Sequence, residues 1–253
     1  MKLKPTRFNM AILETKNLSK IYNPDTVPVH ALRDVSITID KGEFTAVRGP
    51  SGSGKTTLLN MLGGLDRPSK GAVYVDGKEI TNMKDSDLID FRLRNIGFVF
   101  QHYNLIPVFT ARENVSFIML LQNRSKEEIR KRADSLLEQV GLGSKKDSRP
   151  VQMSGGEQQR VAVARALASE PMFILADEPT ANLDTASAMN LLDIMEKMNR
   201  DQNVTFVFST HDQRVIDRAY RVITMVDGAI HKDEKKSPLL PKESHGKGST
   251  PTV

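Results

Sequence analysis

The chain has 253 residues, a formal net charge of +5 and no cysteine. Its length supports one large domain or a core with a subdomain, and the absence of cysteine excludes disulfide bonds and thiolate metal sites. The basic excess lies at the two ends, which argues against nucleic-acid binding and leaves solvated tails or loose contact with an anionic membrane surface. No apolar run approaches the roughly 18 residues of a membrane-spanning helix, and no apolar stretch follows the basic N-terminus as in a secretory signal.

Strand patterns dominate the first hundred residues. We expect an extension over residues 1–10, followed by strands over 11–18 and 35–39. The apolar run 43–47 predicts a further strand, and a glycine-rich turn joins it to the amphipathic segment 58–62. The remaining elements expected in this part are a strand over 71–76, a helix over 85–94 and a strand over 96–100.

The glycine-rich turn has the composition of a phosphate-binding loop, because it contains Gly49, Pro50, Ser51, Gly52, Ser53, Gly54, Lys55, Thr56 and Thr57 in succession. Glycines let the backbone curl around a phosphate with its N–H groups pointing inward, and the N-terminus of the following helix faces the same anion. Lys55 is predicted to contact the β- and γ-phosphates, and the Thr56 hydroxyl to take one position on Mg²⁺. A plain turn rarely carries this whole pattern, so the sequence predicts nucleotide binding.

Two acidic residues end the short apolar strand predicted over 173–176. A strand buried on both faces delivers Asp177 and Glu178 to the edge of the sheet beside the phosphate-binding loop. We expect Asp177 to hold Mg²⁺ through its water shell, and Glu178 to polarise the attacking water as a general base. Adjacent acids at a strand end can also cap a helix or face solvent, but the neighbouring loop favours the catalytic interpretation.

Residues 101–160 interrupt the α/β pattern with helical spacing. Helices are predicted over 110–121 and 125–140, and an alanine-rich helix runs to residue 169. We therefore expect a small helical subdomain inserted in a core that spans 11–230. The core is completed by a helix over 186–199 and strands over 204–209 and 222–226, and residues 231–253 are predicted to form a disordered basic tail.

A second glycine-rich helix start is present at Ser154, Gly155, Gly156 and Glu157. A chain with one nucleotide has no use for a second anion-binding helix end, unless that end serves a nucleotide held elsewhere. Here the sequence resembles an ABC-type ATPase subunit over residues 11–228. The resemblance rests on the order and spacing of the phosphate-binding loop, Gln101, the segment 154–158, the pair Asp177-Glu178, the segment 182–184 and His211.

The resemblance implies a fold and an assembly. The expected α/β fold is a P-loop NTPase core, with helices flanking a mixed sheet, an N-terminal antiparallel β part and the inserted helical subdomain. Two copies of the chain would sandwich two ATP molecules with Mg²⁺, so that the glycine-rich segment 154–157 of one copy caps the γ-phosphate bound to the other. Hydrolysis by this homodimer would drive a separate integral membrane permease, on the cytoplasmic face of the inner or plasma membrane.

The same resemblance implies roles for single residues. Tyr22 matches the aromatic residue that stacks on adenine, although a tyrosine at a strand end can also belong to the core. Gln101 matches the glutamine that touches Mg²⁺ and the attacking water, and it begins the segment that links the core to the membrane partner. His211 matches the histidine that contacts the γ-phosphate, and Asp184 the acid of the loop that crosses the dimer interface. The expected catalytic residues are thus Lys55, Gln101, Glu178 and His211.

Within the family, segments 64–69, 104–107 and 110–115 resemble the group around LolD, MacB and FtsE. Departures from the family pattern are mild: Met153 replaces the usual leucine, and Glu157 the usual glutamine. We expect a separate ATPase subunit of the lipoprotein-release or macrolide-export type. An ATP-driven mechanical signalling subunit, of the cell-division or antibiotic-resistance type, is the alternative. A soluble ABC protein acting on ribosomes or DNA is a third class, which usually has paired ATPase units, zinc motifs or long coiled-coil insertions.

Apolar residues crowd the stretch after Gln101, and no helical or strand period buries them all. Some should form an exposed groove beside the helical subdomain that accepts a short cytoplasmic helix of the permease. Alternatively, they only pack the subdomain against the core. The residues concerned are Tyr103, Leu105, Ile106, Val108 and Phe109.

Overall fold

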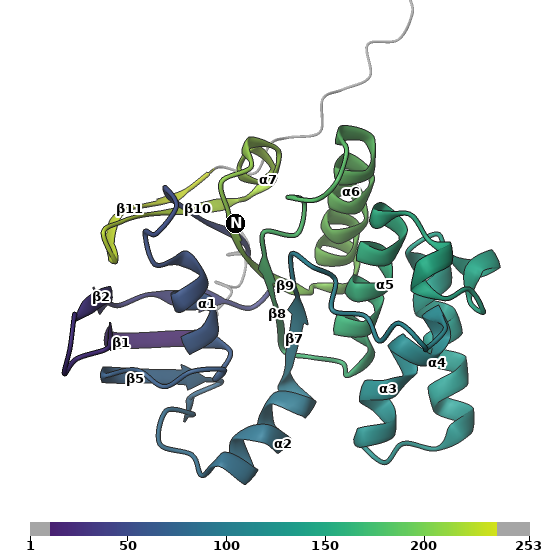
Figure 1. Ribbon diagram of the computed structural model, residues 1–253, viewed down its shortest axis with the longest axis horizontal. Helices are drawn as coiled ribbons and strands as arrows, with labels where there is room; N and C mark the ends of the chain where they lie inside the picture. Colours follow the sequence, from purple (N-terminus) through teal and green to yellow (C-terminus); the bar gives the residue numbers. More distant parts are fainter. Residues whose placement is uncertain (1–10, 237–253) are drawn as a thin grey trace, which may run out of the picture.

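A computed structural model describes residues 11–236 of the chain. A six-stranded sheet in the order β11-β10-β4-β9-β8-β7 runs through its centre (Figure 1). Strands β10, β4, β9, β8 and β7 pair in parallel, and β11 is antiparallel to β10, so the predicted mixed sheet is confirmed. The strand bounds are β4 Phe44–Arg48, β7 Ile96–Val99, β8 Phe173–Asp177, β9 Thr205–Thr210, β10 Arg221–Val226 and β11 Ala229–Lys235.

Aromatic residues fill one face of the central strands. The ring centroids of Phe44 and Phe208 lie 4.6 Å apart, and those of Phe44 and Phe206 lie 5.6 Å apart. All three side chains are buried. A parallel strand covered on both faces is a continuous apolar run, which is why β8 and β9 are recognisable in the sequence. Because these strands run in the same direction, their carboxyl ends meet at one edge of the sheet.

A second, antiparallel sheet packs over the other face, with helix α1 (Lys55–Leu62) between the two sheets (Figure 1). Its order is β2-β1-β5-β6, and β3 also pairs with β1. This sheet is the predicted N-terminal antiparallel part. The strand bounds are β1 Ala11–Tyr22, β2 Val29–Val35, β3 Thr38–Asp40, β5 Lys70–Val75 and β6 Lys78–Glu79.

The single strand predicted over 35–39 is wrong, because the structure has two strands here: β2 ends at Val35 and β3 begins at Thr38. Val35 pairs with Leu18, whereas Thr38 pairs with Glu14, so the chain steps from one part of β1 to another. The Thr15 hydroxyl bridges the break: it donates to the carbonyl of Val35 at 2.9 Å and accepts the N–H of Ile37 at 3.0 Å.

Helices cover the aromatic face of the central sheet. Helices α3 and α4 pack against each other and against α5, at the right of Figure 1, and α6 packs beside α5. Capping boxes start α3 at Thr110 and α4 at Ser125, in agreement with the predicted helix starts. The helix bounds are α2 Asp85–Asn95, α3 Ala111–Leu121, α4 Lys126–Gln139, α5 Gly155–Ala168, α6 Thr185–Gln202 and α7 Gln213–Arg218.

The prediction that disorder begins at residue 231 is wrong, because β11 continues to Lys235 as the edge strand beside β10. Arg221 on β10 is buried, and its guanidinium pairs with Asp233 at 2.6 Å and Glu43 at 3.0 Å. A buried arginine needs such partners, and Asp233 is therefore held in the sheet. Residues 1–10 and 237–253, predicted as an extension and the rest of the tail, lie outside the described residues.

Candidate functional site

A pocket of about 680 Å³ opens where the carboxyl ends of β8 and β9 meet the N-terminus of α1. It brings together residues that are far apart in the chain. The predicted site residues on its wall are Tyr22, Ser51, Gly52, Gly54, Lys55, Thr56, Thr57, Gln101, Glu178 and His211.

The glycine-rich loop folds as its composition requires. Gly54 has a φ of +96°, and a Cβ there would lie 2.4 Å from the carbonyl oxygen of Ala31, so a side chain would be both strained and obstructed. The buried Lys55 follows as the first residue of α1, and its Nζ donates to the carbonyls of Gly49 and Pro50, each at 3.0 Å. An ammonium group has three donors, so one remains for a ligand at the mouth of the loop.

Oxygen atoms from two elements meet beside the lysine. The Thr56 hydroxyl donates to both oxygens of Asp177, at 3.0 Å and 3.2 Å. Asp177 is the last residue of β8, as the sequence predicted. A hydroxyl and a carboxylate are hard oxygen ligands, the kind that Mg²⁺ takes alongside phosphate oxygens and water. The predicted metal-binding pair therefore fits this cation.

Glu178 and His211 contact each other on the wall of the pocket. The Oε1 atom of Glu178 lies 2.8 Å from Nδ1 of His211, and Oε2 accepts the hydroxyl of Thr210 at 3.3 Å. The Glu178 side chain is only 15% exposed, whereas His211 is 73% exposed, so the acid is held deep and the histidine stands at the rim. An enclosed carboxylate beside an accessible imidazole is suited to proton transfer at the pocket mouth.

Tyr22 lies on the pocket wall and is tethered by a residue that the sequence did not single out. Its phenol donates to Asp66 at 2.9 Å, and Lys20 binds the same carboxylate at 2.8 Å. The Lys20 ammonium also lies 4.8 Å from the centroid of the Tyr22 ring. Burial and the hydrogen bond with Asp66 raise the pKa of Tyr22, so the ring is neutral and fixed in orientation.

The second glycine-rich segment lies outside this pocket. Ser154 caps α5 in a capping box with Glu157, whose carboxylate also binds Lys145 at 2.6 Å. This ion pair and the backbone N–H of Ser154 lower the pKa of Glu157. A Cβ on Gly156 would lie 2.8 Å from Ser187 near the start of α6, which is capped by Asp184. The two helix starts that carry these predicted residues are therefore adjacent, and neither lines the pocket.

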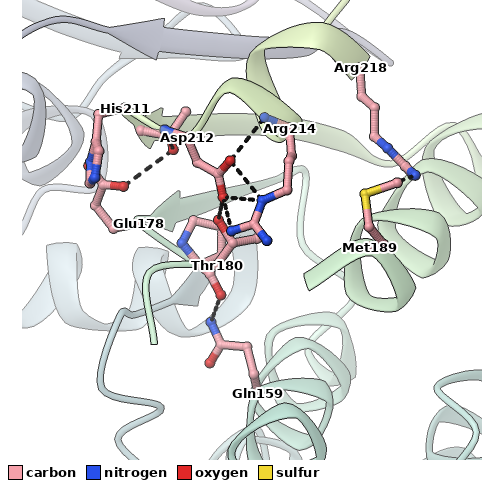
Figure 2. Close-up of polar contacts among 10 residues, drawn as sticks. Gln159, Glu178, Thr180, Met189, His211, Asp212, Arg214 and Arg218 are labelled. Carbon is pink, nitrogen blue, oxygen red and sulfur yellow. Dashed lines mark hydrogen bonds and ion pairs between the residues drawn. The ribbon is translucent and has the colours of Figure 1, made fainter. Parts of the chain in front are cut away.

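A network of polar contacts beside Glu178 and His211 could not be foreseen from the sequence (Figure 2). The Thr180 hydroxyl donates to Asp212 at 2.6 Å, and Arg214 forms an ion pair with the same carboxylate at 2.7 Å. Burial alone would raise the pKa of Asp212, but hydrogen bonds from Arg214 and Thr180 outweigh it and lower the pKa to about 2. The available signal was the position of Asp212, which follows His211 directly and begins α7 as an N-cap.

A phosphate-binding loop after β4, an acidic pair at the end of β8 and a histidine after β9 lie at or beside one pocket, and together they define a P-loop nucleotide-binding protein. Residues 32–181 match the family model described as ABC transporter. The chain belongs to this family as an ATP-binding subunit, which confirms the family predicted from the sequence. Within residues 11–236, no helix combines the length and hydropathy required to cross a membrane.

Relatives match almost the whole chain. An uncharacterised ABC transporter ATP-binding protein of Thermotoga maritima is 47% identical over 89% of this chain and 96% of its own length. The lipoprotein-releasing system ATP-binding protein LolD 1 of Chlorobium chlorochromatii is 48% identical over 80% of this chain and 82% of its own length. The macrolide export ATP-binding/permease protein MacB of Neisseria meningitidis is 41% identical over 94% of this chain, which covers 37% of that larger protein.

Solved structures of ABC transporter cassettes superpose on this chain. A dimeric bacterial ABC transporter cassette superposes with a TM-score of 0.82 at 42% identity, covering 88% of this chain and 98% of that one. A cassette in a dimeric post-hydrolysis state, bound to ADP and phosphate, gives a TM-score of 0.81 at the same identity and coverage. The P-loop NTPase fold predicted from the sequence is therefore confirmed.

Proposed function

We propose that this chain hydrolyses ATP in the 680 Å³ pocket, in the service of a membrane permease. The observation that carries the proposal is the convergence of Lys55, Glu178 and His211 on one pocket wall. Lys55 would bind the β- and γ-phosphates, and the Glu178 carboxylate would accept the proton of the attacking water. His211, at the rim, would contact the γ-phosphate. A solved relative bound to ADP and phosphate supports this chemistry.

Mg²⁺ would be held by Thr56 and Asp177, with Gln101 as the third predicted contact. When bound, the cation neutralises charge on the phosphate oxygens. Gln101 lies on the pocket wall, and its backbone carbonyl accepts a hydrogen bond from the Asn182 side-chain amide at 3.0 Å. That bond fixes the point at which the chain leaves the pocket.

The assembly we propose is a homodimer that encloses two ATP molecules. The segment 154–157 and Asp184 lie outside the pocket of their own chain, so they are free to meet the nucleotide of a second copy. The exposed Ser154 stands at the N-terminus of α5, and a helix N-terminus favours a negative ligand. The dimeric state of the two solved relatives supports this arrangement.

A permease would dock beside the helices. A groove of about 190 Å³ lies between β7 and α5, and Phe98, Phe100, Ile118 and Arg165 line it. Of the residues expected to form a groove, Val108 is 70% exposed, although it does not line this groove, and Leu105 is partly buried against the core. Leu105 thus packs the subdomain against the core, as the alternative interpretation predicted, while the exposure of Val108 supports a docking surface. The names of two relatives support this proposal, since one belongs to a lipoprotein-releasing system and the other is an ATP-binding/permease protein.

The purified protein tests the nucleotide site directly. Lys55→Ala should weaken binding of MgATP by about tenfold or more, because a charge-assisted bond to phosphate in a partly dehydrated site is lost. Lys41→Ala, which removes an exposed lysine at the turn before β4, is the matched control. Titration with a fluorescent ATP analogue measures both affinities. Equal affinity in the two variants would refute the assignment of Lys55.

A further inference from the structure

The segments that carry Glu178 and His211 run beyond the paired part of the sheet. Strands β8 and β9 remain in register up to Asp177 and Ser209. Past that point the backbone is joined by one hydrogen bond, from the N–H of Glu178 to the carbonyl of Ser209 at 2.9 Å. Side chains of the two segments supply the remaining contacts, and Figure 2 shows them.

Asp212 connects the two segments. The Thr180 hydroxyl, which is completely buried, donates to its Oδ2 atom at 2.6 Å. Arg214 donates to the same carboxylate through its backbone N–H at 2.9 Å and through its guanidinium at 2.7 to 3.0 Å. A carboxylate with so many donors has a fixed orientation, so Thr180 meets an acceptor that is set by the 210–214 segment.

The link continues to the catalytic pair through Thr210. The N–H of Asp212 donates to the Thr210 hydroxyl at 2.9 Å, so the one hydroxyl proton is free to point elsewhere. It points to Oε2 of Glu178, at 3.3 Å, while Oε1 of Glu178 lies 2.8 Å from His211. Both oxygens of the acid are therefore oriented by the segment that Asp212 organises.

Glu178 needs this support because its backbone is strained. Its φ of +44° lies in the left-handed region, which a residue other than glycine adopts only when its surroundings impose it. The turn that follows is held from the other side by the buried Gln159, whose amide donates to the carbonyl of Pro179 at 2.9 Å. The Thr180–Asp212 bond and the Gln159 bond thus clamp the residues immediately after Glu178.

We propose that Thr180 and Asp212 are positioning residues for ATP hydrolysis, which hold the strained turn of Glu178 against the His211 segment. Neither lines the pocket, so they act through Glu178 and His211 and not on the nucleotide. The proposal rests on the proposed function, in which Glu178 is the general base. It predicts a loss of kcat with no loss of ATP affinity.

Thr180→Val tests this, because valine keeps the shape of the buried side chain and removes only the hydroxyl. We expect kcat to fall by about tenfold to a hundredfold, as for a small displacement of a catalytic group. KM and the affinity for a non-hydrolysable ATP analogue should stay within about twofold. Thr180→Ser restores the hydroxyl and should recover most of the lost kcat.

Thr15→Val is the matched control, because Thr15 is also buried and also bridges two segments through its hydroxyl, but in the antiparallel sheet. It should lower the unfolding temperature and leave kcat unchanged. If Thr15→Val lowers kcat as much as Thr180→Val, the effect is one of general stability and the proposal is refuted.

Asp212→Asn provides a second measurement should Thr180→Val fold poorly. Asparagine still caps α7, but it cannot keep both the charged contact with Arg214 and the acceptor for Thr180. We expect the same fall in kcat at unchanged KM. A normal kcat in both folded variants overturns the proposal. Glu178→Gln separates the two proposals. If Glu178→Gln is inactive while Thr180→Val and Asp212→Asn keep normal activity, Glu178 is the base and the positioning role is wrong. Full activity of Glu178→Gln would refute the proposed function.

Discussion

The charge of Asp212 ties stability to pH at the scale of a single residue. Its pKa in the folded protein is about 2, against an ordinary value of 3.8. A carboxyl with a lowered folded pKa stabilises the protein above the unfolded pKa, and this contribution is lost as pH falls through the folded pKa. Asp212 therefore contributes about 2 kcal/mol at neutral pH, and this contribution disappears between about pH 4 and pH 2.

Asp212→Asn should accordingly lower the free energy of unfolding by about 2 kcal/mol at pH 7, and by progressively less below pH 4. Urea unfolding followed by circular dichroism at several pH values measures the difference. Asp217→Asn, at an exposed position on the same helix, is the control and should show little change at any pH. A deficit of the Asp212 variant that stays constant down to pH 2.5 would contradict this linkage.

Site residues that belong to a continuous motif could be predicted, and those joined only by the fold could not. Lys55 and Glu178 sit in short patterns whose spacing alone indicates phosphate chemistry. Asp66 reaches Tyr22 across 44 residues, and Asp212 reaches Thr180 across 32. These contacts exist because β1 passes the end of α1 and because β8 pairs with β9. A local sequence pattern predicts neither arrangement.

At the scale of elements, burial decides what a sequence pattern reveals. Strands β8 and β9 are buried on both faces and were predicted almost to the residue. Strands β2 and β11 are largely exposed edge strands, so their composition resembles that of loops, and they were missed. The helices with capping boxes were predicted within one residue at their starts, because Thr110 and Ser125 mark them chemically.

The irregular segment between β7 and α3 is held in place at both ends. The partly buried guanidinium of Arg165 donates to the carbonyls of Tyr103 and Asn104, and its burial lowers its pKa. Asn114 bonds the backbone of Ile106 in both directions, at 2.8 Å and 3.2 Å. A segment fixed in this way would transmit a displacement at Gln101 to the groove proposed for docking, whereas a flexible loop would absorb the displacement.

Val108→Asp should therefore break the coupling to the permease without harming the fold, because this side chain is 70% exposed. A buried charge at the docking surface disfavours association. We expect loss of co-purification with the permease and of its stimulation of ATP hydrolysis, with unchanged basal hydrolysis and unfolding temperature. Val27→Asp, at a 75% exposed position in the turn between β1 and β2, is the control and should remain bound. A permease that still binds the Val108 variant would show that docking occurs elsewhere.

At the scale of the whole molecule, the proposed homodimer would make each pocket a site shared between two copies. Ser154 and Asp184 of the same chain do not line the pocket, yet both residues are exposed and stand at helix starts. A second copy in head-to-tail arrangement would complete both sites at once, since each copy offers one pocket and one helix start. ATP would then act as part of the interface, and cleavage would remove the phosphate that joins the copies.

Glu178→Gln tests this arrangement, because the amide keeps the shape of the side chain and removes the base. The variant should bind ATP without cleaving it, and should therefore accumulate as a dimer in MgATP and as a monomer in ADP. Light scattering coupled to size exclusion measures the mass in each nucleotide.

Adding Ser154→Ala should weaken the dimer, since the hydroxyl at the start of α5 would contact the partner's γ-phosphate. Adding Ser125→Ala removes an identical capping box from α4 and should leave the dimer intact, which separates lost contact from lost helix stability. If the Glu178 variant stays monomeric in MgATP, or if both serine changes weaken the dimer equally, the shared site between copies is wrong.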